Sequence, residues 1–211
     1  MRRRSLLTLF APSLFALAVS AAPIRVALAQ TPAFQPTAAD AADLRRIETY
    51  LNGLHALKAH FLQVAPNGAI SQGTAWLERP GRMRFQYDPP SPLLLVAGHG
   101  LVIFRDNQLN QTTTILLADH VTLSGDVTVT GLQHLPGQIQ VSLVRTGSPS
   151  EGTLTLVFTD NPLTLKQWSV IDAQRQETRV TLYNVELGGS FDPKLFDLVD
   201  PRFFQGRDGG G

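Results

Sequence analysis

Short stretches of alternating apolar and polar residues, separated by turn residues about every ten positions, constrain this 211-residue chain most strongly. Met83, Phe85 and Tyr87 alternate with polar residues, which is the pattern of a strand that buries one face. Many short strands of even spacing favour a largely antiparallel sheet that curves into a barrel or half-barrel. The sequence predicts strands at 57–63, 72–78, 83–87, 93–97, 101–105, 111–116, 138–145, 153–159, 165–171 and 177–183.

One helix is predicted ahead of these strands. Leu44, Ile47 and Leu51 recur at spacings of three and four residues, so one helical face is apolar. The helix is expected to start within residues 37–40 and to end at Gly53, because glycine accepts the backbone conformation that ends helices. A single helix cannot cover a sheet of roughly ten strands, so the inside of the sheet either fills with side chains or holds a ligand. Residues 117–136 fit either a pair of strands or a lid with a short helix.

The first 29 residues have the composition of a secretory signal peptide. Three arginines precede an apolar run, and residues 27–29 read Ala-Leu-Ala, the small-residue pattern after which signal peptidases cut. We therefore expect export to the periplasm and cleavage after Ala29, through either the general or the twin-arginine route. An uncleaved membrane anchor is the alternative, and it is disfavoured because Pro12 and Pro23 interrupt the apolar run.

The remaining chain is predicted to hold a single domain. We expect a signal peptide at 1–29, a flexible lead at 30–39, the domain at 40–202 and a disordered tail at 203–211. Removal of residues 1–29 takes away four arginines and no acidic residue, so the net charge of +1 falls to −3. Nucleic-acid binding requires a basic surface, so a nucleic-acid partner is not expected.

The residues that usually carry catalysis or bind metals are missing or scattered. The chain has no cysteine, which excludes thiol chemistry, disulfides and a lipid-modified N-terminus. Its five histidines show none of the spacings of a zinc site, and no nucleophile motif is present. We therefore predict a protein that is not an enzyme and that binds no metal or cofactor.

Three segments and their spacing resemble one known family. They read FLQ at 61–63, GTAWLERPG at 73–81 and MRFQYDPP at 83–90, and apolar strands follow them. The match runs over residues 40–116 and resembles the periplasmic lipoprotein carrier family (LolA-type). A looser match covers residues 182–201, where SFDPKLFDLVDP resembles the last strand of that family.

The resemblance implies an α+β fold, in which an incomplete antiparallel β-barrel has an apolar concave face covered by a helical lid. Arg79 matches the arginine that holds the family's lid shut, and its alternative role is an ordinary surface ion pair. Leu77, Met83, Phe85 and Tyr87 fall where the family's acyl-chain cavity lies, although the same pattern also fits plain core.

The function implied by the resemblance is a monomeric, soluble carrier in the periplasm. Such a carrier binds the acyl chains of lipoproteins, takes them from an inner-membrane release complex and passes them to an outer-membrane acceptor. Two alternatives remain open. One is a carrier or sensor of another lipid, and the other is a non-enzymatic interaction protein whose half-barrel has a filled core.

Overall fold

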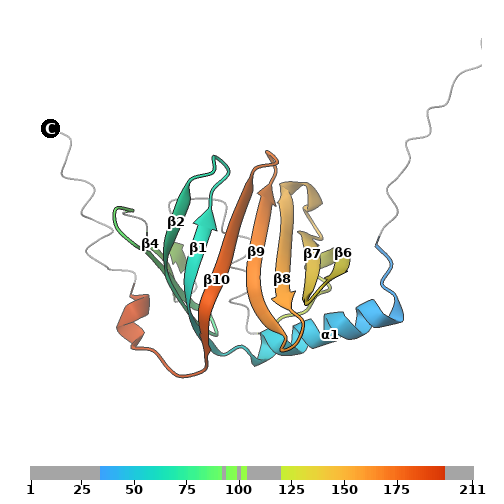
Figure 1. The fold of residues 1–211 in the computed structure, drawn as a ribbon, viewed down its shortest axis with the longest axis horizontal. Helices are drawn as coiled ribbons and strands as arrows, with labels where there is room; N and C mark the ends of the chain where they lie inside the picture. The colour runs from blue at the N-terminus through green and yellow to red at the C-terminus, as the bar shows by residue number, and fades with distance from the viewer. Residues whose placement is uncertain (1–33, 92–93, 99–100, 104–119, 198–211) are drawn as a thin grey trace, which may run out of the picture. The chain divides into compact units, whose positions relative to one another are not determined.

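The structure, a computed structural model, describes residues 34–91, 94–98, 101–103 and 120–197. Within these residues, one α-helix precedes ten strands (Figure 1). Helix α1 (Ala38–Gly53) begins with a capping box, in which Thr37 Oγ1 accepts the Asp40 N–H and the Asp40 carboxylate accepts the Thr37 N–H. The predicted start and end of this helix are confirmed.

The ten strands form one sheet in the order β5-β4-β3-β2-β1-β10-β9-β8-β7-β6. Every neighbouring pair is antiparallel, and the outermost strands β5 and β6 do not pair with each other. The sheet is therefore open, which confirms the predicted half-barrel. The strands are β1 (Ala56–Val64), β2 (Ile70–Glu78), β3 (Arg82–Tyr87), β4 (Leu94–Gly98), β5 (Leu101–Ile103), β6 (Val127–Leu135), β7 (Gln138–Arg145), β8 (Gly152–Thr159), β9 (Thr164–Asp172) and β10 (Glu177–Leu187).

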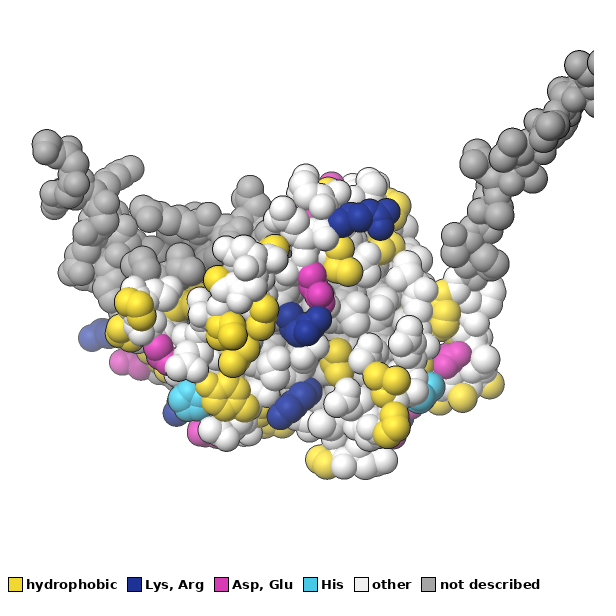
Figure 2. Space-filling view, turned by 45° about the horizontal axis from the view of Figure 1, so that its top comes forward, with side chains coloured by type: hydrophobic (Ala, Val, Ile, Leu, Met, Phe, Trp, Pro, Cys, Tyr) yellow, Lys and Arg dark blue, Asp and Glu magenta, His cyan; other side chains and the backbone are white. Residues whose placement is uncertain are grey.

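The sheet has an apolar inner face, which we define as the face that packs against Ile47 and Leu51 of α1. Strand β1 illustrates the alternation, because Leu57 and Phe61 are buried on this face while His60 is exposed on the other. On the face of the molecule that Figure 2 shows, apolar side chains are scattered among charged ones. The main core thus lies between the helix and the inner face of the sheet.

Residues 120–136 contain no helix and resolve the ambiguity of that region in favour of strand. Val127–Leu135 forms β6, and residues 120–126 form an irregular segment ahead of it. The predicted strand at 111–116 lies outside the described residues, as do the predicted signal peptide and tail. Helix α1 begins at Ala38, two residues ahead of the predicted domain boundary.

The match of residues 190–201 to a last strand is wrong for the part that is described. Pro193–Phe196 forms a 3-10 helix (η3), and the three residues before it belong to no strand. The reason is local, because Pro193 has no N–H for a strand ladder and Asp192 Oδ1 accepts the Lys194 N–H at 2.9 Å to cap a turn. Arg84 of β3 holds this turn by donating to the Leu195 carbonyl at 2.9 Å.

Among the residues that the structure describes, no helix combines the length and the apolar character that crossing a bilayer requires.

Gly73 of β2 provides a test of the register between β2 and β3. A Cβ at this position would overlap the carbonyl oxygen of Gln86, whereas a Cβ at Gly131 of β6 meets nothing within 4 Å. We expect Gly73→Ala to lower the free energy of unfolding by about 1–3 kcal/mol, as overpacking does elsewhere. Gly131→Ala is the matched control, and urea denaturation measures both. Equal losses in the two variants would contradict the register.

Candidate functional site

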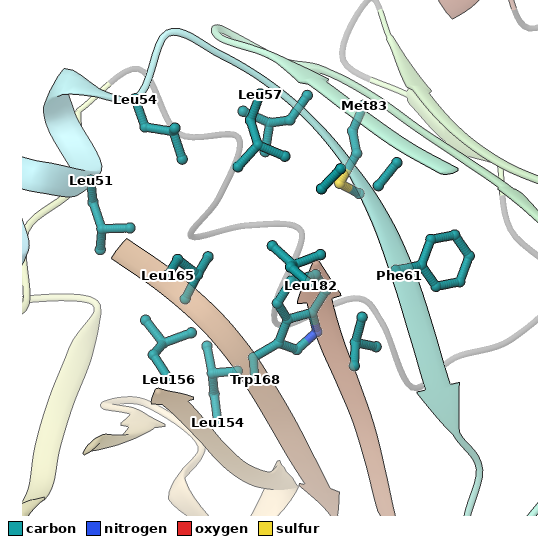
Figure 3. Packing of buried hydrophobic residues seen from close by; sticks show 14 of the residues in the cluster. Leu51, Leu54, Leu57, Phe61, Met83, Leu154, Leu156, Leu165, Trp168 and Leu182 are labelled. Atoms are coloured by element: carbon teal, nitrogen blue, oxygen red, sulfur yellow. The ribbon is translucent and has the colours of Figure 1, made fainter. Parts of the chain in front are cut away.

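A small apolar cavity lies within the inner face of the sheet, and Figure 3 labels several of the residues that line it. Its volume is about 20 Å³. Three of the residues predicted to line a cavity do so, namely Leu77, Met83 and Phe85. The complete lining is Leu54, Leu57, Ala75, Leu77, Met83, Phe85, Leu165, Trp168 and Leu182.

The register of three neighbouring strands brings the predicted residues together. Leu77 of β2 pairs with Leu57 of β1 on one side and with Met83 of β3 on the other. Residues directly opposite each other in an antiparallel sheet point to the same face, so these three side chains form a row across it. Phe85 lies two pairs further along β3, opposite Ala75 and on the same face.

Tyr87 is buried on the same face, but it is not among the residues that line the cavity. Its hydroxyl donates a hydrogen bond of 2.7 Å to Gln63 Oε1, and its ring lies 5.0 Å from that of Phe61. Tyr87 therefore has polar and aromatic partners of its own beside the cavity.

The other three lining residues, Leu165, Trp168 and Leu182, come from β9 and β10, far along the chain from β1–β3. Leu182 reaches the cavity because it pairs with Phe61 of β1, and Trp168 pairs with Val180 of the same strand β10. The Trp168 and Phe85 rings meet edge to face with their centroids 6.0 Å apart. Sequence reasoning placed these residues in strands but did not assign them to the site.

The cavity is too small for an acyl chain in this structure. A volume of about 20 Å³ has room for roughly one water molecule, whereas pockets for small molecules measure roughly 300–1,000 Å³. A larger ligand therefore enters only where the elements around the cavity separate. Helix α1 packs on the inner face through its buried residues Ile47 and Leu51.

Arg79 connects the β2–β3 turn to the C-terminal end of α1. Its Nη1 donates to the carbonyl of Leu51, and its backbone N–H donates to the carbonyl of His55 at 2.8 Å. The last carbonyls of a helix have no partner within the helix and carry its negative dipole end, so a cation is favourable there. The last turn of α1 has no basic residue of its own. Arg79 provides that cation from a distant turn.

A second contact joins the same end of α1 to residues 120–124, which we call the strap. Asn52 pairs with Val121 in both directions, donating to its carbonyl at 2.9 Å and accepting its N–H at 2.8 Å. Glu48 accepts the Leu123 N–H at 2.7 Å. Val121 and Leu123 are themselves buried in the core. The strap is thus fixed to α1 by side-chain hydrogen bonds and contributes two apolar residues to the core.

The N-terminal half of α1 is held by charged groups. Asp43 lies 2.8 Å from His134 Nε2 of β6, and Arg46 bridges Asp43 to Asp160 of the β8–β9 turn. The hydrogen bond with His134, together with Arg46, lowers the pKa of the Asp43 carboxyl, although its partial burial acts in the opposite direction. These partly exposed pairs are weak individually, so this end of the helix is held without a large core.

An open antiparallel half-barrel with one covering helix and an apolar interior defines the class of protein to which the chain belongs. The family model for the outer membrane lipoprotein carrier protein LolA matches residues 52–199. The chain therefore belongs to the LolA family, as its sequence motifs predicted.

Individual relatives agree with this assignment. An outer-membrane lipoprotein carrier protein of Azotobacter vinelandii is 28% identical over 187 residues, which cover 80% of this chain and 89% of the relative. The protein of the same name from Methylococcus capsulatus is 26% identical over 173 residues, covering 74% and 83%. The chain is also similar to the crystal structure of MucB, with a TM-score of 0.45 and 14% identity over 77% of this chain and 64% of that one.

Asn52 allows a direct test of the contact between helix and strap. We expect Asn52→Ala to abolish the slow hydrogen exchange of the Val121 amide, because Asn52 Oδ1 is its acceptor. Arg45→Ala is the control, since Arg45 is exposed on the same helix. Hydrogen exchange resolved to single amides measures both variants. Unchanged protection at Val121 in Asn52→Ala contradicts the contact.

Proposed function

We propose that this protein is a periplasmic carrier that binds the acyl chains of lipoproteins and moves them from the inner to the outer membrane. Membership of the LolA family supports this proposal. The observation that carries it is the apolar cavity beside Leu54, at the point where α1 meets the sheet. On this proposal the protein binds and releases its cargo and catalyses no reaction.

The free energy of hydration explains why such a carrier is needed. Each methylene exposed to water costs about 0.8 kcal/mol, so one long acyl chain costs on the order of 10 kcal/mol. A protein that shelters the chain between α1 and the sheet removes this cost during transit. Met83 and Phe85 suit the purpose, because methionine and aromatic rings adapt to ligands of different shape.

Opening requires that α1 separate from the inner face. The polar contacts holding its C-terminal half are those of Arg79, Asn52 and Glu48. A hydrogen bond contributes roughly 1 kcal/mol to stability, so these four bonds together are worth less than the burial of one acyl chain. The chain also replaces part of the apolar contact that Ile47 and Leu51 lose. Cargo therefore has enough binding free energy to displace the helix.

Within this proposal, Arg79 acts as the latch of the lid, and Leu77, Met83, Phe85 and Tyr87 form the wall that an acyl chain contacts. The carrier acts as a monomer between an inner-membrane release complex and an outer-membrane acceptor. Reclosure of the helix on the emptied face, with Arg79 back on the Leu51 carbonyl, favours release at the acceptor.

A second candidate is an interaction protein whose half-barrel has a filled core and takes no ligand. The small volume of the cavity favours it, since about 20 Å³ holds no acyl chain. The two candidates differ in one measurable property, which is whether lipid enters the inner face.

Native mass spectrometry with lipid extraction distinguishes these candidates. The protein is purified from the periplasm, and bound species are identified by mass. Bound lipoprotein, or its acylated N-terminal fragment, supports the proposed carrier. Bound phospholipid or fatty acid alone indicates a carrier of another lipid. Protein that carries no lipid and also fails to take up a fluorescent acyl probe supports the second candidate, the interaction protein with a filled core.

Replacing Arg79 tests the latch. In Arg79→Leu the closed state loses its bond to the Leu51 carbonyl, so less free energy opposes opening. We expect the affinity for an acyl probe to rise about tenfold and its dissociation to slow. Arg145→Leu is the control, because Arg145 forms a surface pair with Glu151 at 3.8 Å, away from the cavity. Stopped-flow fluorescence with the probe measures both. If the probe dissociates from Arg79→Leu and from the wild type at the same rate, Arg79 plays no part in release.

A further inference from the structure

The indole N–H of Trp168 is a buried hydrogen-bond donor without an acceptor among the residues that the structure describes. Only 2% of the residue is exposed. Buried polar groups are nearly always paired, so one that is not requires an explanation. Trp168 lies on β9 and lines the cavity, where Figure 3 shows its indole beside Leu182.

The other side chains around the cavity are apolar. Eight of the nine lining residues are leucine, alanine, methionine or phenylalanine, so Trp168 contributes the one side-chain donor of the lining. Binding pockets for apolar ligands are built in this way, with a mostly apolar wall and a few polar groups that fix the ligand's orientation.

The described side chains around the cavity are poorly suited to hold a water molecule against this donor. The cavity of about 20 Å³ has room for one water, but a buried water is held by two to four polar partners. The lining side chains offer only one polar partner, the Trp168 indole N–H itself. A ligand that pairs with the indole in this lining would carry its acceptor on an otherwise apolar molecule.

We propose that the Trp168 indole N–H donates a hydrogen bond to the carbonyl oxygen that joins an acyl chain to its head group. This inference rests on the proposed carrier function and adds a selectivity to it, for acyl esters and amides over plain alkyl chains. The cavity adjoins Leu54, just after the end of α1, so lifting the helix brings the indole to the opening through which a head group must pass. Arginine and asparagine hold the helix over this same end of the cavity.

A matched pair of ligands tests the selectivity. Hexadecanoyl glycerol carries an ester carbonyl, and hexadecyl glyceryl ether has the same chain without it. We expect the wild type to bind the ester about three- to tenfold more tightly than the ether, the usual effect of one hydrogen bond. In Trp168→Phe the preference disappears because the affinity for the ester falls. Trp76→Phe is the matched control, since Trp76 lies on the outer face and does not line the cavity. Isothermal titration calorimetry measures all six affinities.

Each outcome separates this inference from the proposed function. Binding of ester and ether with equal affinity by the wild type overturns the role of Trp168 and leaves the carrier intact. Binding of neither ligand overturns the carrier itself. A preference that persists in Trp168→Phe assigns the carbonyl contact to another residue and also overturns the inference.

Nuclear magnetic resonance of the indole groups gives a second readout that does not depend on how well a variant folds. The chain has two tryptophans, so the nitrogen–proton spectrum contains two indole signals, and Trp76→Phe identifies them. The Trp168 signal is expected to move downfield with the ester and much less with the ether. An equal shift with both ligands shows that the N–H meets no carbonyl, for example because it rests on the Phe85 ring.

Discussion

The antiparallel pairing of β1 with β10 is the interaction on which the rest of the structure depends. Strands β1–β5 form one meander and β6–β10 another, and only this pairing joins them into a single sheet. It sets Phe61 opposite Leu182, and thereby places the Met83 side of the cavity against the Trp168 side. Because β1 directly follows α1, the same pairing places the C-terminal end of the helix near this junction, while the rest of α1 runs beside β9, the β8–β9 turn and β6 (Figure 1). The β1–β10 pairing therefore fixes the position of both the cavity and the end of the helix beside it.

Two kinds of interaction hold α1 on the sheet, namely apolar packing in the interior and a small number of polar contacts along the helix. Arg79, Asn52 and Glu48 hold the C-terminal half of α1, and the Asp43–His134 pair holds the other half. Each contact is modest, so the helix is fixed in place without being irreversibly packed. Such an arrangement suits a protein that must open for a ligand whose burial is worth more than the contacts it breaks. The Trp168 N–H, which has no acceptor among the described residues, is the group that we propose a ligand carbonyl pairs with.

Local patterns in the sequence predicted the elements well and their long-range partners poorly. Period-two alternation placed Leu77, Met83 and Phe85 on one face, and the sheet confirms it because neighbouring residues in register share a face. Tyr87 follows the same alternation, yet its hydroxyl pairs with Gln63, a contact that alternation does not encode. Trp168 and Leu182 were missed because they join the site through the β1–β10 pairing. The strap was missed because residues 120–126 have no periodicity and are held by side chains of α1.

The distance between α1 and the sheet, measured with and without an acyl ligand, tests the central claim most directly. The chain has no cysteine, so cysteines introduced at the exposed positions Arg45 on α1 and Gln72 on β2 carry spin labels without interference. Double electron–electron resonance gives the distribution of distances between them. The account predicts that ligand shifts this distribution to longer distances, as the helix leaves the inner face. A ligand that binds with full occupancy and leaves the distribution unchanged would show that the acyl chain does not enter beneath α1.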